Sequence, residues 1–101
     1  KNEPKRSIPP GVNYAPFENI PMQLSVRGMT AEEAVTAVEK YLDSVSIANL
    51  ETVYILHGKG TGALRKAVDS YLRIHPLVES HRLGYFNEGG SGVTVVKIKK
   101  S

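Results

Sequence analysis

The sequence predicts an α/β domain with two layers, a mixed four-stranded sheet and two helices that lie mainly on one face of it. Four segments have strand-like alternation or β-branched composition, and helical segments separate the first three, in the order β-α-β-α-β-β. Strands that alternate with helices form parallel pairs through right-handed crossovers. Only glycine-rich residues join the last two strands, so the last strand should run antiparallel, and the second sheet face should be more open.

The first strand and helix follow a stretch that is rich in proline. Residues 1–21 contain five of the six prolines and are predicted to be a linker or arm, and residues 22–101 to be the domain. In this N-terminal segment, Tyr14, Phe17 or Ile20 are expected to order the chain where they pack on the domain.

Alternation predicts a strand over residues 22–26. Thr30 and Glu33 form the pattern of a capping box, which predicts a helix over 31–47. The apolar residues of that helix recur at helical spacing: Ala34, Val35, Val38, Tyr41, Leu42 and Val45. Residues 51–56 are apolar and β-branched and predict the second strand.

The second half of the chain repeats this organisation. Thr61 is the predicted N-cap of a second helix, which Pro76 ends because proline cannot continue the hydrogen-bond ladder. Residues 77–84 predict a third strand, and a glycine-rich loop leads to a last strand over 93–99.

Composition limits the function classes. The chain has 101 residues, enough for one small domain, and it begins with lysine, so we expect it to be part of a longer protein. A net charge of +3 permits a polyanionic partner without requiring one. The absence of cysteine excludes disulfides, thiolate metal sites and cysteine nucleophiles. No apolar run approaches membrane-spanning length, so no membrane partner and a cytoplasmic location are expected.

Three loops should meet at one edge of the sheet. Arg27 follows the first strand, the "HGKG" loop follows the second, and the "GGSG" loop begins after the third. Ligands of open α/β sheets bind outside the carboxyl ends of the strands, where helix N-termini also present free N–H groups. Because Arg27, Lys59 and Arg65 add positive charge, this edge predicts a phosphate site.

The phosphate of a nucleic acid fits better than that of a cofactor. "GKGTGA" matches a dinucleotide-binding pattern, but only 39 residues follow Gly62, and the acidic residue at the required distance, Glu79, begins a strand. The spacing of a nucleotide-hydrolysing P-loop is absent. Arginine, lysine and backbone amides are the groups that hold a phosphodiester backbone.

Three motifs, "LSVRGM", "HGKGTGALR" and "GGSGVTVV", resemble those of an Smr (small MutS-related) domain over about residues 22–98. The resemblance is greatest to the carboxyl-terminal domains of bacterial MutS paralogues that suppress recombination. It implies a two-layer fold similar to the carboxyl-terminal domain of translation initiation factor three, with strand order 1-2-4-3.

The resemblance also implies an activity and partners. Members of this family nick DNA or cleave RNA, so we expect an endonuclease that acts in suppression of recombination or ribosome rescue. Expected partners are DNA, including branched DNA, or alternatively RNA and the ribosome, with a homodimeric bacterial parent protein. We expect no cofactor in this domain, because ATP belongs to the parent. The alternative that substrate phosphates carry a weakly bound Mg²⁺ or Mn²⁺ into the site is left open.

His57 and Arg27 are the predicted catalytic residues. An imidazole gains or loses a proton near neutral pH, and a guanidinium stabilises charge that develops on a phosphate. The alternatives are a structural histidine that ties the strand end to a carbonyl, and a surface arginine. Where the family motif usually has aspartate, this chain has Ser25. The substitution favours the alternative that the domain binds nucleic acid without cutting it.

Further residues are predicted to contact nucleic acid at the three motifs: Ser25, Gly58, Lys59, Gly60, Thr61, Gly62, Arg65, Gly89, Gly90 and Gly92. No two histidines occur with a carboxylate at the sequence spacing typical of metal ligands, so no resident metal site is predicted. His81 and Arg82 would lie on the third strand, facing either nucleic acid or solvent.

Overall fold

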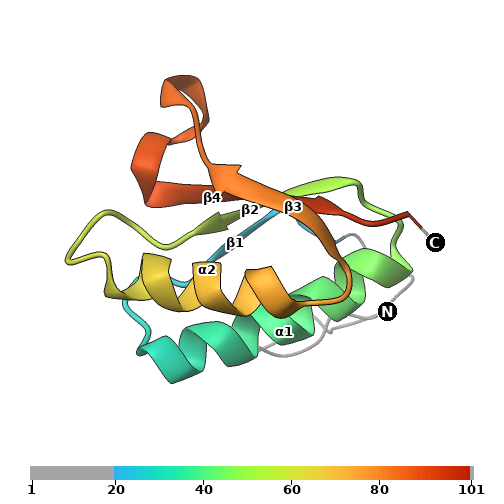
Figure 1. Ribbon diagram of the computed structural model, residues 1–101, viewed down its shortest axis with the longest axis horizontal. Coiled ribbons are helices and arrows are strands. Elements are labelled where there is room, and N and C mark those ends of the chain that lie inside the picture. The colour runs from blue at the N-terminus through green and yellow to red at the C-terminus, as the bar shows by residue number, and fades with distance from the viewer. Residues whose placement is uncertain (1–19, 101) are drawn as a thin grey trace, which may run out of the picture.

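The computed structural model describes residues 20–100, which form two layers (Figure 1). A four-stranded sheet makes one layer, and both helices cover the same face of it (Figure 1). The helices and strands are β1 (Gln23–Ser25), α1 (Ala31–Ile47), β2 (Thr52–Leu56), α2 (Ala63–Ile74), β3 (Val78–Leu83) and β4 (Val93–Ile98).

The strand order is β1-β2-β4-β3. Strands β1 and β2 are parallel, and β4 is antiparallel to both of its neighbours. The predicted fold class, the antiparallel last strand and the strand order implied by the resemblance are confirmed. In the part of the chain that the structure describes, neither helix is long and apolar enough to cross a membrane.

The start of the domain is held against α1. Ile20 packs on the hydrophobic core, and the carbonyl of Pro21 accepts a hydrogen bond from the Tyr41 hydroxyl. The predicted packing of Tyr14 and Phe17 lies outside the described residues.

Helix α1 begins as its sequence predicts. The Thr30 hydroxyl accepts a hydrogen bond from the Glu33 amide at 3.1 Å, and the Glu33 carboxylate accepts one from the Thr30 amide at 2.9 Å. This reciprocal pair satisfies two backbone donors that the first helical turn would leave free.

The predicted cap of α2 is wrong by one residue. Gly62 is the N-cap, in a left-handed conformation (φ +87°), and no side chain caps the helix. The Thr61 hydroxyl accepts a bond of 3.3 Å from the Ala63 amide. Glycine adopts this backbone conformation at little cost. The helix therefore begins after Gly62, one residue later than a Thr61 cap would place it.

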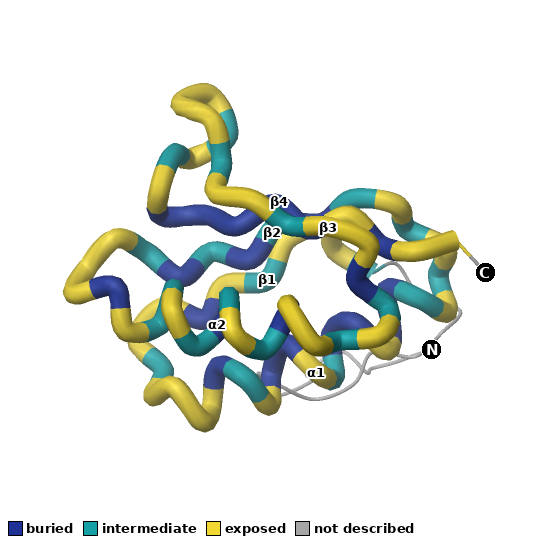
Figure 2. Tube along the Cα trace, viewed as in Figure 1, coloured by how far each residue is buried: buried dark blue, intermediate teal, exposed yellow. Residues whose placement is uncertain are grey.

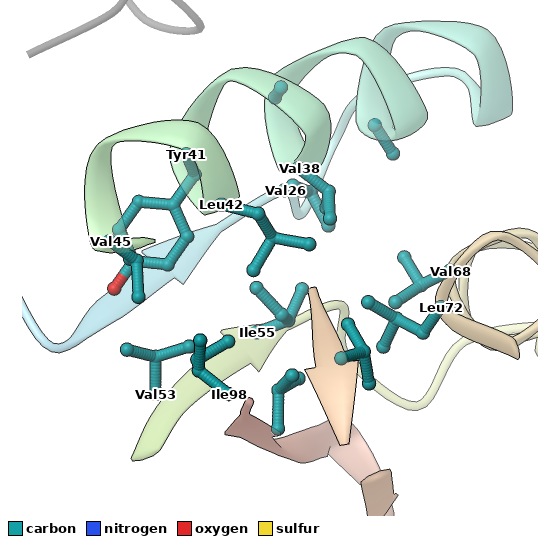
Figure 3. Packing of buried hydrophobic residues seen from close by; sticks show 14 residues of the cluster. Val26, Val38, Tyr41, Leu42, Val45, Val53, Ile55, Val68, Leu72 and Ile98 are labelled. Atoms are coloured by element: carbon teal, nitrogen blue, oxygen red, sulfur yellow. The ribbon is translucent and has the colours of Figure 1, made fainter. Parts of the chain in front are cut away.

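The core fills the space between the helices and the sheet (Figure 3). Leu42 points from α1 toward Ile55 on β2, while Val68 and Leu72 approach from α2 (Figure 3). All four side chains have 1% exposure or less. Packing of these apolar faces fixes the position of α1 and α2, and therefore the edge of the sheet at which both helices begin.

Candidate functional site

A cavity of about 420 Å³ lies at the carboxyl ends of β1 and β2. Its lining residues come from the two loops and the start of α2: Arg27, Gly28, Met29, His57, Gly58, Lys59, Gly60, Thr61, Gly62, Leu64 and Arg65. The lining includes three cationic side chains and no carboxylate. It also includes the N-terminus of α2, where the N-cap Gly62 has no side chain to bond the first-turn amides and the helix dipole is positive. This combination favours an anion.

Arg27 lies over the second loop. A Cβ atom on Gly58 would be only 3.4 Å from Arg27 Cγ, so the glycine leaves room for the arginine stem. Arg27 Nε donates to Ser25 Oγ at 3.3 Å. Ser25 is thus a neutral partner that orients Arg27 from outside the cavity lining, and it leaves the guanidinium charge available to a ligand.

His57 is buried, with 4% exposure, although it lines the cavity. Its Nδ1 lies 2.9 Å from the Gly58 carbonyl oxygen, and its Nε2 lies 2.8 Å from Thr94 Oγ1. A carbonyl only accepts, so Nδ1 carries the hydrogen of the first bond, whereas the Thr94 hydroxyl can donate or accept. Both ring nitrogens are therefore engaged within the protein.

The third motif reaches the second through Gly92. The Gly92 carbonyl accepts hydrogen bonds from the amides of His57 at 3.1 Å and Gly58 at 2.9 Å. The Lys59 side chain lies beside Gly92, since an added Cβ there would be 3.4 Å from Lys59 Cγ. Gly89 and Gly90 precede Gly92 in the β3–β4 connection, and none of these three glycines is among the residues that line the cavity.

A second cavity, of about 250 Å³, continues the basic surface between α2 and β3. Its lining is Arg65, Lys66, Asp69, Arg73, His81, Arg82, Leu83 and Thr94, so Arg65 borders both cavities. Hydrogen bonds from Arg73 and then His81, at 2.9 and 2.8 Å, hold the pKa of Asp69 below its usual value. Since Asp69 is paired, the groove keeps excess positive charge.

Two features of the site were missed at the sequence level. Thr94 is 2% exposed and supplies the partner of His57. A polar residue within the apolar run of β4 was the available signal for it. His81 and Arg82 do not share a face of the sheet, because successive residues of a strand point to opposite faces. His81 binds Asp69 on α2, on the helix side. Arg82, which lies opposite Val95 on β4, contacts Tyr85 in the β3–β4 connection. Among residues 20–100, no group of three histidine or acidic side chains is arranged to hold a metal.

Arg82 anchors the β3–β4 connection. Its guanidinium donates to both carboxylate oxygens of Glu88, at 2.7 and 3.1 Å, and lies 3.9 Å from the centre of the Tyr85 ring. Hydrogen bonds from Arg82, and then from the Tyr85 amide, lower the pKa of Glu88 to about 2.

We expect an NMR titration of Glu88 to show a midpoint of about 2, instead of the ordinary 4.5. Because the pKa is lower in the folded state, this contribution to stability is present above the ordinary value and is lost as the pH falls toward 2. In Arg82→Ala the midpoint should return toward 4.5. A wild-type midpoint of 4.5 would contradict the Arg82–Glu88 pairing.

Comparisons with known proteins agree with the motifs. The model of the Smr domain family matches residues 24–99. The chain is 52% identical over 83 residues to "Endonuclease MutS2" of Clostridium beijerinckii, covering 82% of this chain and 11% of that protein. The protein of the same name from Staphylococcus carnosus is 52% identical over 80 residues, 79% of this chain and 10% of that protein. The chain thus spans about a tenth of the length of the curated relatives it matches.

Two solved structures have the same fold. The crystal structure of the Smr domain of Thermus thermophilus MutS2 superposes with a TM-score of 0.76 at 42% identity, covering 77% of this chain and 98% of that one. YdaL, a stand-alone small MutS-related protein from Escherichia coli, gives 0.74 at 25% identity, covering 78% and 65%. From its motifs, its fold and these matches, the chain belongs to the Smr domain family.

Proposed function

We propose that this domain is an endonuclease domain that holds a nucleic acid backbone in the cavity at the sheet edge and hydrolyses one of its phosphodiester bonds. The observation that carries the proposal is the lining of that cavity, where Arg27, Lys59 and Arg65 occur without a carboxylate. A phosphodiester is the anion whose charge and shape suit cationic side chains beside backbone amides. The name of the relatives, endonuclease MutS2, supports a cleavage reaction.

The backbone of the bound strand would follow the two cavities. Arg27 and Lys59 would neutralise the non-bridging oxygens at the reacting phosphate, where charge increases in the transition state. Arg65 borders both cavities, so the next phosphates would lie in the groove between α2 and β3, near Lys66.

In the proposed hydrolysis, a water oxygen forms a bond to phosphorus while the bond from phosphorus to the leaving ester oxygen breaks. One proton leaves the attacking water, and one is delivered to the leaving oxygen. His57 is the proposed proton-transfer group, and it must exchange its bond with Thr94 or Gly58 for one with water or substrate. The lining offers no carboxylate to hold Mg²⁺ or Mn²⁺, so no step is assigned to a metal.

A second candidate function is a nucleic-acid-binding module without cleavage. Two observations favour it: Ser25 replaces the usual motif aspartate, and both His57 nitrogens are engaged inside the protein. The two functions share the same surface and differ only in chemistry. Cleavage that appears on Ser25→Asp, and is absent from the wild type, would identify what this module lacks.

Arg27→Ala tests the proposed surface. We expect its affinity for a DNA duplex to fall roughly tenfold, and the slope of log affinity against log salt to decrease in magnitude by about 0.9, the loss of one phosphate contact. Binding is measured by fluorescence anisotropy at several salt concentrations. Lys99→Ala is the matched control, because Lys99 is an exposed cation at the opposite end of β4. It should change neither value.

The same proteins are then incubated with supercoiled plasmid and with a structured RNA, with and without Mn²⁺. Nicking by the wild type that weakens in Arg27→Ala supports the endonuclease. Salt-dependent binding without nicking under any condition favours the module. If the wild type binds neither nucleic acid, or if Lys99→Ala and Arg27→Ala behave alike, the proposed surface is wrong.

For the longer parent protein, the resemblance supports further proposals. These are a homodimer that uses ATP in another domain, and a cytoplasmic role on branched DNA or on ribosomes. Suppression of recombination and ribosome rescue are the two roles it would serve.

A further inference from the structure

The β3–β4 connection forms an arm, residues 84–92, that rises from the sheet on the side away from α1 and α2 (Figure 1). Its tip is exposed (Figure 2). Phe86 is 99% exposed and Tyr85 is 63% exposed. A phenyl ring in full contact with water contributes nothing to the core, so Phe86 and the adjacent Tyr85 leave aromatic surface on the arm free for a ligand.

The arm holds Phe86 in place without packing against it. Arg82 binds Glu88 through two hydrogen bonds and lies against the Tyr85 ring. The Tyr85 amide donates to the Glu88 carboxylate at 2.8 Å, and the Gly90 amide donates to the Tyr85 carbonyl at 2.9 Å. A ring presented on such a braced turn loses little conformational entropy when it binds.

The base of the arm is part of the candidate site. Gly92, where the arm ends, accepts hydrogen bonds from the amides of His57 and Gly58, and the Lys59 side chain lies beside it. The Arg27 side chain also lies against Gly58. A strand whose phosphates contact Arg27 and Lys59 therefore passes the foot of the arm.

We propose that Phe86 stacks on an unpaired base of the nucleic acid strand whose backbone binds at the edge cavity. The inference rests on the proposed function and names its substrate class: nucleic acid with single-stranded or unpaired nucleotides. A phenyl ring has no hydrogen-bonding group, so it accepts any base and reads no sequence. In a continuous duplex the faces of the bases are covered by their neighbours, so Phe86 finds no partner there. The cations nearer the base of the arm, Arg82 against the Tyr85 ring and Lys59 beside Gly92, suit a polyanion better than an apolar protein surface.

The chain contains no tryptophan, so Phe86→Trp introduces a single tryptophan on the arm, which can be excited selectively over the five tyrosines. We expect a single-stranded oligonucleotide to quench its emission on binding, and a fully paired duplex of the same sequence, with sealed hairpin ends, to leave it nearly unchanged. Ile74→Trp is the control, because Ile74 is 80% exposed at the end of α2. Its emission should not respond to either ligand.

Phe86→Ala gives the energetic test. Its affinity for the single strand should fall about 5- to 150-fold, the loss of one stacked base, while its affinity for the sealed duplex stays at the wild-type value. The inference is overturned if quenching is absent at position 86 or equal at positions 86 and 74. It is also overturned if Phe86→Ala keeps its affinity for the single strand. In either case, wild-type binding preserves the proposed function. An equal loss on both ligands overturns it too. If the wild type binds neither ligand, both proposals fail.

Discussion

His57→Ala is expected to cleave supercoiled DNA at least about 100-fold more slowly than the wild type, the usual contribution of a general acid or base. Its affinity for DNA should change little, because the cations that hold the backbone are Arg27, Lys59 and Arg65. The measurement is a single-turnover nicking assay at saturating enzyme, with binding followed separately. Saturation matters because it separates loss of the chemical step from loss of affinity.

Two companion variants distinguish proton transfer from support of the loop. His57→Asn retains an N–H donor for the Gly58 carbonyl but cannot carry a proton, so it should be as slow as His57→Ala. Thr94→Val removes the hydroxyl that holds Nε2 and leaves the imidazole in place. It should keep most of the cleavage rate. If Thr94→Val is as slow as His57→Ala, the imidazole acts by positioning the loop. Full nicking activity in His57→Ala excludes any catalytic role.

Leu42→Ala should lower the free energy of unfolding by about 2–5 kcal/mol, because it removes a fully buried side chain and leaves a cavity. A domain of about 80 residues is expected to have a total of roughly 4–12 kcal/mol, so one substitution removes a large share. Urea denaturation followed by circular dichroism measures the difference.

Ile74→Ala is the matched control for the core substitution. It also truncates a large aliphatic side chain on a helix, but that side chain is 80% exposed, so the free energy of unfolding should change by less than about 0.5 kcal/mol. A loss below about 1 kcal/mol in Leu42→Ala would show that the layer between α1 and β2 is not packed as described.

The elements themselves could be predicted from the sequence because each carries its own local signal. The capping box at Thr30 and the helical spacing of apolar residues define α1 without help from the rest of the chain. Strand order differs, since it depends on pairing between distant segments. The resemblance supplied the order, whereas periodicity alone left it open. The one-residue error at Thr61 arose because glycine, not a side-chain cap, starts α2.

Much of the site could be located but not its internal bonds. The rule that parallel strands end at one edge brought Arg27 and His57 together correctly. The bond between His57 and Thr94 joins residues 37 positions apart in the sequence, and no local pattern encodes it. The bonds within the arm could not be predicted either. Its glycines indicated a loop, but the two hydrogen bonds from Arg82 to Glu88 that brace it depend on the three-dimensional positions of both residues.

Among the described residues 20–100, β4 comes after the other three strands in sequence, yet it lies between β2 and β3 in the sheet. During synthesis, β2 and β3 therefore emerge without the strand to which both must pair, and the sheet cannot close until residues 93–98 have left the ribosome. A chain that stops before Val93 would lack the pairing partner of both strands and the Thr94 hydroxyl that holds His57. Emergence of β4, closure of the sheet and assembly of the candidate site are thus one event in the folding of this domain.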